Sequence, residues 1–287
     1  MAEKELLGKI HKVELEMLIE FDRVCSELGL RYTLSSGTLL GAVRHGGFIP
    51  WDDDIDVAMP REDYERFILE TPRMLNDGKY EVEHYSNNKN VRQVFAKFRN
   101  NKTTFIQPEN LGSKINQGIG MDIFPVDRFP DEEKIKKTVA KKHAMYWRFQ
   151  WADSKAFRKT IPSKVKRIIA WGMGIVTKIV GYQTFIKKEE KMNTAFRNDN
   201  SATATCADSI AKVKWMPYSW FEEYTTITFE GKEFSVITNY KGYLERIYGD
   251  YMTLPPEDKR VVHLAEIIDC ERPYTDYVDE KGNLIQK

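Results

Sequence analysis

The segment WDDDIDVAM, residues 51–59, constrains the fold more than any other part of the chain. Acidic or small residues alternate in it with large apolar ones, namely Asp54, Asp56 and Ala58 with Ile55, Val57 and Met59. A period of two is typical of a β-strand, in which successive side chains point to opposite faces. We therefore predict a strand over residues 54–59 with one face in the core and one charged face.

The acidic face of this strand predicts a metal site. Asp52, Asp53, Asp54 and Asp56 are four carboxylates within five residues, and a strand would hold Asp54 and Asp56 about 7 Å apart. Carboxylates this close need raised pKa values or a cation between them, and Mg²⁺ or Mn²⁺ prefers such oxygen ligands. The alternative is an acidic turn that is simply solvated.

Two other segments support a phosphate-handling site. Residues 35–37, Ser-Ser-Gly, open a short helix about twenty residues before the acidic strand. Backbone N–H groups at a helix N-terminus can receive phosphate oxygens. Asp122 lies in a later apolar segment, GIGMDIFPVD, whose neighbours Met121 and Ile123 would face the core. Asp122 could therefore complete a site of three carboxylates.

The other patterns predict helices and strands in mixed order. Apolar residues three and four apart predict a helix over residues 6–28 that ends at Gly29. Glycines and prolines mark the ends of further elements. We predict helices over 38–46, from Pro60 onward and over 240–248, and strands over 31–34, 80–85, 92–98, 103–106 and 118–127, with a hairpin over 225–237 that turns at Glu230, Gly231 and Lys232.

The near-neutral net charge of +1 conceals a strong segregation of charge. Residues 134–191 contain 16 Lys and Arg but three acidic residues, a net charge of +13, so the rest of the chain carries −12. The basic stretch is helical in pattern and rich in aromatic residues. It predicts either contact with an anionic membrane surface or a helical subdomain with a buried apolar face and solvated lysines. The neutral total argues against a general nucleic-acid binder.

Cysteine usage and hydropathy indicate a cytoplasmic protein, with peripheral contact at the inner face of the cell membrane as a further option. The three cysteines are far apart, which favours neither a disulfide framework nor a zinc site. The N-terminal residues have no apolar signal region. The longest apolar run, residues 168–176, is shorter than the roughly 20 residues of a membrane-spanning helix.

Three motifs resemble the LicD family, which includes phosphocholine transferases and is related to fukutin-related protein. They are SSGTLLGAVRHGGFIPWDDDIDVAMPREDYERF, IGMDIFPVD and YGDYMTLPPEDKRVVH. The resemblance implies an α+β fold, a nucleotidyltransferase-like (polymerase-beta-type) mixed sheet flanked by helices, with a helical basic insertion. We expect a catalytic core over 1–130, the basic aromatic region over 131–200, and a C-terminal part over 201–287 that completes a single catalytic domain.

The resemblance also implies an activity. A phospho-alcohol, typically phosphocholine from CDP-choline or another CDP-alcohol, would pass to a hydroxyl of a cell-surface glycan with release of CMP. The acceptor would be a teichoic acid precursor or lipopolysaccharide, either free or lipid-linked. The family's metal carboxylates match Asp54 and Asp56, with Asp52 as an extra ligand and Asp122 as the third acid. Ser36 and Gly37 occupy the phosphate turn.

Further candidates follow from position and residue type. Arg44 and His45 could contact the diphosphate, unless Arg44 pairs with one of the aspartates. Lys97 and Arg99 could neutralise phosphate, or could protect an edge strand. His263 is a weaker candidate, because a lone histidine is more often structural. A choline group could bind to aromatic faces by cation–π attraction, and the candidates are Trp51, Trp215, Tyr218 and Trp220.

Two alternative functions stay open at this point. A nucleotidyltransferase of the same fold would add a nucleotide to RNA, protein or a small molecule. A non-catalytic regulator would bind a nucleotide or polymer through the basic segment. The three candidate carboxylates argue against the regulator, because a binding module does not need acids placed for metals.

Overall fold

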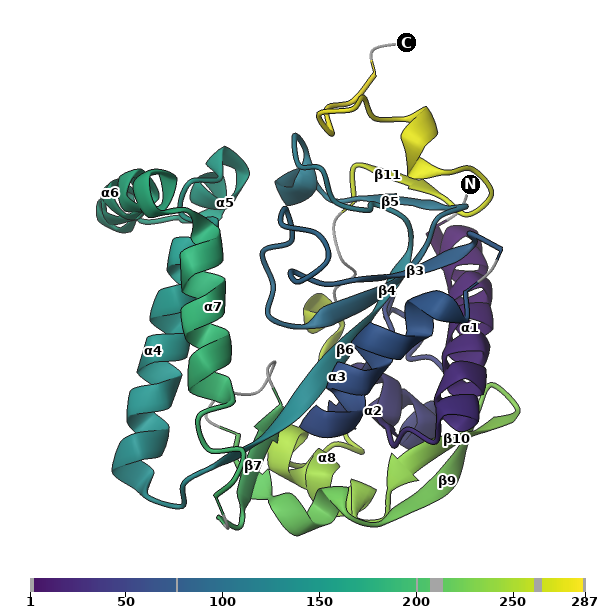
Figure 1. The fold of residues 1–287 in the computed structure, drawn as a ribbon. Helices are drawn as coiled ribbons and strands as arrows, with labels where there is room; N and C mark the ends of the chain where they lie inside the picture. The colour runs from purple at the N-terminus through teal and green to yellow at the C-terminus, as the bar shows by residue number, and fades with distance from the viewer. Residues whose placement is uncertain (1–2, 76, 200, 207–213, 261–264, 286–287) are drawn as a thin grey trace.

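The computed structural model of the chain describes residues 3–75, 77–199, 201–206, 214–260 and 265–285. A curled, mixed sheet of seven strands forms its centre, with helices around it (Figure 1). The strands follow the order β1-β2-β6-β4-β3, and β7 pairs with both β6 and β8. Their bounds are β1 Thr33–Leu34, β2 Asp56–Pro60, β3 Tyr80–Glu83, β4 Ala96–Asn100, β6 Gly120–Phe129, β7 Thr203–Cys206 and β8 Met216–Pro217. The predicted mixed sheet flanked by helices is confirmed.

Strand β6 connects all parts of this sheet. Its first half pairs with β2 in parallel and with β4 antiparallel, and its second half pairs with β7. The parallel register places Asp56 of β2 directly beside Asp122 of β6. Met121 and Ile123 are buried, as their parity predicts. The two predicted acidic positions are therefore neighbours across one strand pair.

The acidic strand is shorter than its alternation predicts. β2 begins at Asp56, so Asp54 lies in the segment that leads into the strand. A turn precedes it, in which the Asp52 N–H donates to the Ile49 carbonyl. Ala58, predicted on the charged face, is fully buried because both faces of β2 are covered there.

Three helices surround the sheet near these strands, and their bounds are α1 Glu3–Leu28, α2 Ser36–His45 and α3 Arg61–Glu70. The middle of the stripe predicted on the first helix is buried, while Leu6, Val13 and Leu28 are half-buried. Phe21 of α1 packs against Phe67 of α3 and Phe98 of β4. Pro60 precedes the first turn of α3, where its missing N–H costs nothing. Strand β4 begins four residues later than predicted, at Ala96.

The basic segment forms the helices α4 Glu133–Trp151, α5 Lys155–Thr160, α6 Lys164–Val180 and α7 Tyr182–Asn193. We call α4–α7 the helical arm. The helices α4 and α7 lie side by side, and α5 and α6 lie at the far end of this pair (Figure 1). The arm is tied to the sheet region, because Arg92 bonds Asp153 and Tyr182 bonds the Lys89 carbonyl. Within the described ranges, no helix is long and apolar enough to cross a membrane.

The C-terminal part returns to strands from earlier in the chain. The predicted hairpin is present as β9 Tyr224–Phe229 and β10 Lys232–Ile237, and its turn has positive φ at Glu230 and Gly231. The helix α8, Tyr240–Tyr248, ends at Gly249 as predicted. Strand β11, Ile267–Asp269, pairs with β5, Thr104–Ile106. Sequence-distant segments thus complete the structure around the acidic strand.

Candidate active site

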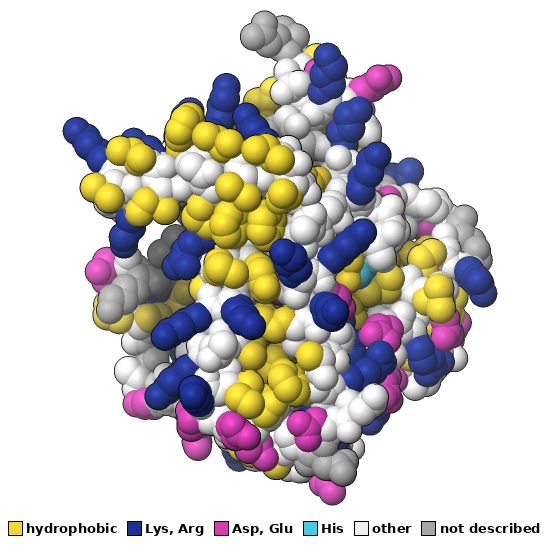
Figure 2. Space-filling view, turned by 60° about the vertical axis from the view of Figure 1, so that its left-hand side comes forward, with side chains coloured by type: hydrophobic (Ala, Val, Ile, Leu, Met, Phe, Trp, Pro, Cys, Tyr) yellow, Lys and Arg dark blue, Asp and Glu magenta, His cyan; other side chains and the backbone are white. Residues whose placement is uncertain are grey.

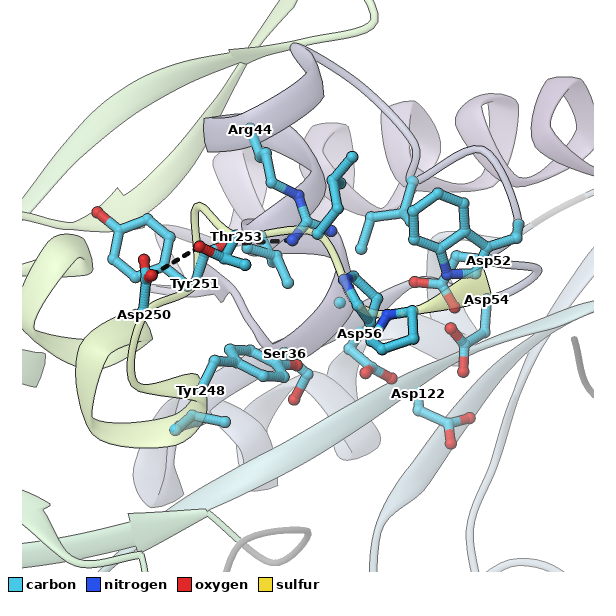
Figure 3. Close-up of a pocket in the computed structure, with 18 of the residues that line it drawn as sticks. Ser36, Arg44, Asp52, Asp54, Asp56, Asp122, Tyr248, Asp250, Tyr251 and Thr253 are labelled. Atoms are coloured by element: carbon cyan, nitrogen blue, oxygen red, sulfur yellow. Dashed lines mark hydrogen bonds between the residues drawn. The ribbon is translucent and has the colours of Figure 1, made fainter. Parts of the chain in front are cut away.

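One cavity of about 870 Å³ brings together most of the predicted site (Figure 3). Its walls come from the start of α2, the segment that enters β2, strand β6 and the loop after α8. We call it the acidic cavity. The predicted residues that line it are Ser36, Gly37, Arg44, Trp51, Asp52, Asp54, Asp56 and Asp122. Residues chosen from two distant motifs therefore face one space.

Backbone hydrogen bonds hold the start of α2 against β2. The Asp56 N–H donates to Thr38 Oγ1 at 2.8 Å, and the Ser35 N–H donates to the Asp56 carbonyl at 3.0 Å. Ser36 has a φ of +45°, a left-handed conformation that is uncommon for a residue with a side chain. Its N–H donates to the Tyr243 hydroxyl at 3.4 Å. The Ser36 N–H already has this partner. A phosphate would therefore bind to other backbone N–H groups in the first turn of α2.

Gly37 allows an aspartate to lie over the start of α2. A Cβ atom at this position would come 2.5 Å from Asp52 Oδ2, closer than real contacts of that kind. Asp52 also lies in a fixed turn, where its carbonyl accepts a hydrogen bond from His11 at 2.7 Å. The glycine of the predicted phosphate turn thus has a steric role toward a neighbouring carboxylate.

A smaller cavity of about 160 Å³ also reaches the carboxylates. Asp54 and Asp122 line it together with Asp53, Lys97 and Glu14. Lys97 forms an ion pair with Asp122, a contact that the sequence analysis did not predict. These two aspartates therefore lie between two spaces, of which the acidic cavity is the larger.

Glu14 of α1 is a site residue that the sequence analysis missed. Its side chain is buried, and its Oε2 has no hydrogen-bond partner within the described structure. Burial, with the nearby Asp54 and Asp53 adding to it, raises the pKa of Glu14 well above its usual value. A signal was present, because Glu14 lies four residues after Ile10 and three before Met17 on the apolar face of the helix.

The charge of the acidic cavity is strongly negative. Five aspartates and one arginine line it, the fifth aspartate being Asp250. In the part of the chain that the structure describes, no three His, Cys, Asp or Glu side chains form a ready-made metal-ligating group. The carboxylate-rich lining suits a divalent cation, but the predicted metal ligands stay a prediction.

Arg44 lines the cavity without an aspartate partner. Its Nη1 donates to the Tyr251 carbonyl at 3.0 Å (Figure 3), and no described carboxylate lies within ion-pair distance of it. Burial lowers the pKa of Arg44. The predicted alternative of a pair with an aspartate is thus wrong. His45, by contrast, is exposed and packs edge-on against Trp51, outside the lining of the cavity.

The predicted basic strand is not an edge strand, because β4 lies between β3 and β6. The interpretation of Lys97 and Arg99 as edge protection is therefore wrong. Arg99 is buried, with its Nε 3.5 Å from Glu83 and its Nη1 bonded to the Gly118 carbonyl. It borders the smaller cavity and not the larger one. Of this pair, Lys97 alone contacts a carboxylate of the acidic cavity.

The structure does not assemble the predicted aromatic residues around the cavity. Trp51 lines it, with the Arg260 guanidinium 4.7 Å from its ring centre. Trp215 is buried against Phe129. The Arg128 guanidinium carbon lies 3.3 Å from the centre of the Tyr218 ring and covers it. Trp220 lies near them on the short helix Tyr218–Phe221, outside the cavity lining. His263 falls outside the described residues.

The last residue of α8 and the loop after it supply residues that the sequence analysis did not single out. Tyr248, Asp250, Tyr251 and Thr253 line the cavity, and Thr253 donates to Asp250 at 2.6 Å (Figure 3). The motif YGDYMTLPPEDKRVVH contains all four, but its spacing does not show that the loop reaches β2. That contact depends on α2 and α8 lying side by side.

Comparison with known proteins agrees with this geometry. The protein-family model "LicD/FKTN/FKRP, nucleotidyltransferase domain" matches residues 29–160. The chain is 31% identical over 270 residues to the lipopolysaccharide cholinephosphotransferase LicD of Haemophilus influenzae, which covers 88% of this chain and 94% of that protein. The chain belongs to the LicD family.

A shorter match extends to animals. The human ribitol 5-phosphate transferase FKRP is 52% identical over 40 residues, 14% of this chain and 8% of that protein. The matched family domain contains Asp52, Asp54, Asp56 and Asp122. The loop of Tyr248 and Asp250 lies beyond it, although it lines the same cavity. The LicD-family domain and the C-terminal loop thus build the site jointly.

Proposed function

We propose that this LicD-family chain transfers phosphocholine, or a similar phospho-alcohol, from a CDP-activated donor to a hydroxyl of a cell-surface glycan. The acceptor oxygen forms a bond to the phosphorus that carries the alcohol, the bond from that phosphorus to the bridging oxygen breaks, and CMP leaves. The hydroxyl proton passes to a base. The observation that carries the proposal is the acidic cavity itself, in which four aspartates of the LicD motifs face one space.

The name of the Haemophilus relative supports the class of reaction. That protein is a lipopolysaccharide cholinephosphotransferase, aligned over nearly its full length. FKRP, a ribitol 5-phosphate transferase, also moves a phospho-alcohol. We propose lipopolysaccharide as the first acceptor to test and a teichoic acid precursor as the second, with a cytoplasmic site of action. The polymerase-beta-type fold and the division at residues 130 and 200 are part of the same proposal.

Asp54, Asp56 and Asp122 would hold Mg²⁺ or Mn²⁺, with Asp52 as a further ligand. Asp56 and Asp122 are paired in register on adjacent strands, so their carboxylates approach the cavity from one sheet surface. A bound divalent cation would neutralise charge on the diphosphate and on the departing CMP. Without cations, five aspartates and one arginine would repel a diphosphate.

The residues of this chain would orient the donor from two sides. Arg44, held by the Tyr251 carbonyl at the C-terminal end of α2, would bind phosphate oxygens of the donor. Tyr248 and Asp250, on the opposite wall, offer an aromatic face and a carboxylate to a choline ammonium. In Figure 3 the Tyr248 ring lies close to Ser36. In this arrangement the alcohol end of the donor would lie toward α8.

Asp122 is suited to receive the proton of the acceptor hydroxyl. It borders both cavities and contacts Lys97. The Lys97 ammonium group would hold the Asp122 carboxylate in place beside β2. Lys97 would therefore act as a positioning residue for Asp122.

A product assay tests the proposed function. The protein is incubated with Mg²⁺, lipopolysaccharide and CDP-choline that carries label in the choline, in parallel with CDP-ribitol and CDP-glycerol. We expect free CMP and labelled glycan with one of the donors, and loss of both products on chelation of the cation. Nucleotide retained on the acceptor would instead show a nucleotidyltransferase. Nucleotide binding without turnover on either acceptor would show a regulator.

A further inference from the structure

Helix α6 exposes large apolar side chains to solvent. Eight of the 18 exposed large hydrophobic side chains among the described residues belong to this one helix. Their spacing of three and four residues places them on one face. They are Val165, Ile168, Ile169, Trp171, Ile175, Val176, Ile179 and Val180. Ile168 and Ile179 are 69% and 78% exposed, so the face is open and not a partly covered core.

The face of α6 that contacts the rest of the protein carries small residues instead. Ala170, Gly174 and Thr177 are its buried positions. A Cβ at Gly174 would come 2.5 Å from the Ala152 carbonyl oxygen, and Thr177 Oγ1 donates to the Phe149 carbonyl at 2.7 Å. An ordinary surface helix buries its large residues and exposes polar ones. The predicted alternative of a helical subdomain with a buried apolar face is therefore wrong for α6.

Positive charge surrounds this apolar face. No acidic residue occurs in residues 155–180, which form α5 and α6, while seven basic residues do, and Figure 2 shows dark blue side chains on both sides of the yellow rod of α6. The seven are Lys155, Arg158, Lys159, Lys164, Lys166, Arg167 and Lys178. A large apolar face flanked by Lys and Arg, with Trp171 in it, is typical of a helix that lies in a membrane interface.

An apolar cavity of about 690 Å³ adjoins the same face. It lies between α4, α5 and α6. Ile169 of the exposed face also lines it, together with the aromatic side chains of Trp147 and Phe157. Two cations, Arg148 and Lys166, border it as well. This combination suits a lipid whose chain enters the cavity and whose phosphate meets the basic residues.

We propose that α5 and α6 bind the surface of an anionic lipid bilayer, with the apolar face of α6 inserted at the headgroup level. Charge decides between a bilayer and a second copy of the chain. A symmetric dimer through this face would bring the seven basic residues of each copy together without acidic partners on α5 or α6. Anionic headgroups neutralise those same residues. The inference does not depend on the transferase reaction.

Vesicle flotation tests the inference. The full-length protein is mixed with vesicles of phosphatidylcholine containing about one-third phosphatidylglycerol, and with pure phosphatidylcholine vesicles, at about 0.15 M salt. We expect flotation with the anionic vesicles alone, and a loss of about tenfold in the bound fraction near 1 M salt, where charges are screened. Absence of flotation with anionic vesicles at the lower salt would overturn the inference.

Matched variants separate the α6 face from general surface stickiness. Ile168→Ser combined with Ile179→Ser removes two exposed side chains of α6. The control, Leu69→Ser combined with Ile285→Ser, removes two exposed side chains outside the helical arm. We expect about a tenfold loss of bound protein for the first pair and no change for the second. Equal behaviour of the two pairs would contradict the inference.

Two further measurements test whether the variants stay folded and whether the chain is a dimer. Circular dichroism of both double variants should show unchanged melting, because all four side chains are exposed. Sedimentation without lipid should show a monomer for the parent chain and for both variants. A parent dimer that dissociates in the Ile168→Ser, Ile179→Ser variant would assign the face to a second copy and overturn the lipid proposal.

Discussion

The acidic cavity and the helical arm each concentrate charge of one sign, but on surfaces of opposite shape. Around the cavity, five aspartates converge on a concave space with one arginine among them. On α5 and α6, basic side chains surround an apolar face that projects into solvent. A concave group of like charges stores repulsion that a bound cation can relieve, whereas solvent screens dispersed charges on a projecting helix. The comparison teaches that an excess of like charge predicts a bound ligand where the surface is concave and a binding surface where the helix projects.

The largest expected effect concerns the aspartates of the cavity. Asp56→Asn or Asp54→Asn should lower turnover at least about 10³-fold, because each removes a carboxylate proposed to bind the cation. The free energy of unfolding should stay the same or rise, since like-charge repulsion decreases. Activity assays and urea unfolding check both, with exposed Asp199→Asn as the control. Undiminished turnover would remove these residues from the site.

The junction between the two regions gives the next effect. Arg61 of α3 is buried and bonds Asp127 of β6 at 2.6 Å and Glu190 of α7 at 2.7 Å. Arg61→Met should lower the free energy of unfolding by about 3–5 kcal/mol, because a buried carboxylate loses its partner. Arg66→Met on the same helix breaks an exposed pair with Glu70 and an exposed hydrogen bond to the Leu28 carbonyl, and should cost about 1 kcal/mol or less. If Arg61→Met and Arg66→Met lower the free energy of urea unfolding by similar amounts, the buried pairs of Arg61 contribute no special stability.

The same junction predicts a pH dependence. Burial raises the pKa of Glu190 to about 7 despite the neighbouring Arg61. The folded state therefore binds more protons than the unfolded state between the usual glutamate pKa and 7, and stability decreases as pH rises through that window, by up to about 3 kcal/mol. Glu190→Gln should remove this decrease. Glu257→Gln, on a 90% exposed side chain, is the control.

His84 also contributes to the pH dependence of stability, so its contribution must be distinguished from that of Glu190. Burial lowers the pKa of His84 to about 3, so its contribution has the opposite sign: stability is lost as pH falls below the usual histidine pKa. The quantity to compare is therefore the difference between Glu190→Gln and the parent chain across pH 4.5–7, measured by urea unfolding. A difference that does not change with pH would contradict the raised pKa of Glu190.

The smallest effects come from two glycines, one in each region. Gly37→Ala should raise the donor KM about five- to tenfold, or about 1 kcal/mol, because the new Cβ displaces the Asp52 carboxylate. Gly172→Ala in α6 meets no atom within 4 Å and should stabilise the protein by roughly 0.5–1 kcal/mol. Steady-state kinetics and thermal melts check the pair. An unchanged KM for Gly37→Ala would mean that Asp52 does not position the donor.

Much of the secondary structure was predictable because its signals are local. The apolar stripe of α1, the turn at Glu230 and Gly231, and the end of α8 at Gly249 were all predicted from neighbouring residues. The start of β2 was placed two residues too early, because alternation continues through Asp54 while strand pairing does not. Local pattern thus predicts the type of an element better than its end.

The partners of the site residues were less predictable. Arg44 was expected at the phosphates or at an aspartate, and it bonds the Tyr251 carbonyl, 207 residues away in the chain. Tyr218 was a candidate for choline, yet Arg128 covers its ring. Glu14 was overlooked, although it lies on an apolar helix face. Each outcome depends on how distant segments pack, which no spacing along the chain encodes directly.

The sequence by itself determined the acidic strand, the third aspartate at residue 122, the separation of charge and the LicD motifs, because these are patterns among neighbouring residues. The tertiary structure alone decided that β2 and β6 pair in parallel with Asp56 beside Asp122, and that the loop after α8 closes the cavity. It also decided which face of α6 is exposed. That choice follows from close packing, since only the small side of α6 fits against the Ala152 carbonyl and leaves the large residues outside.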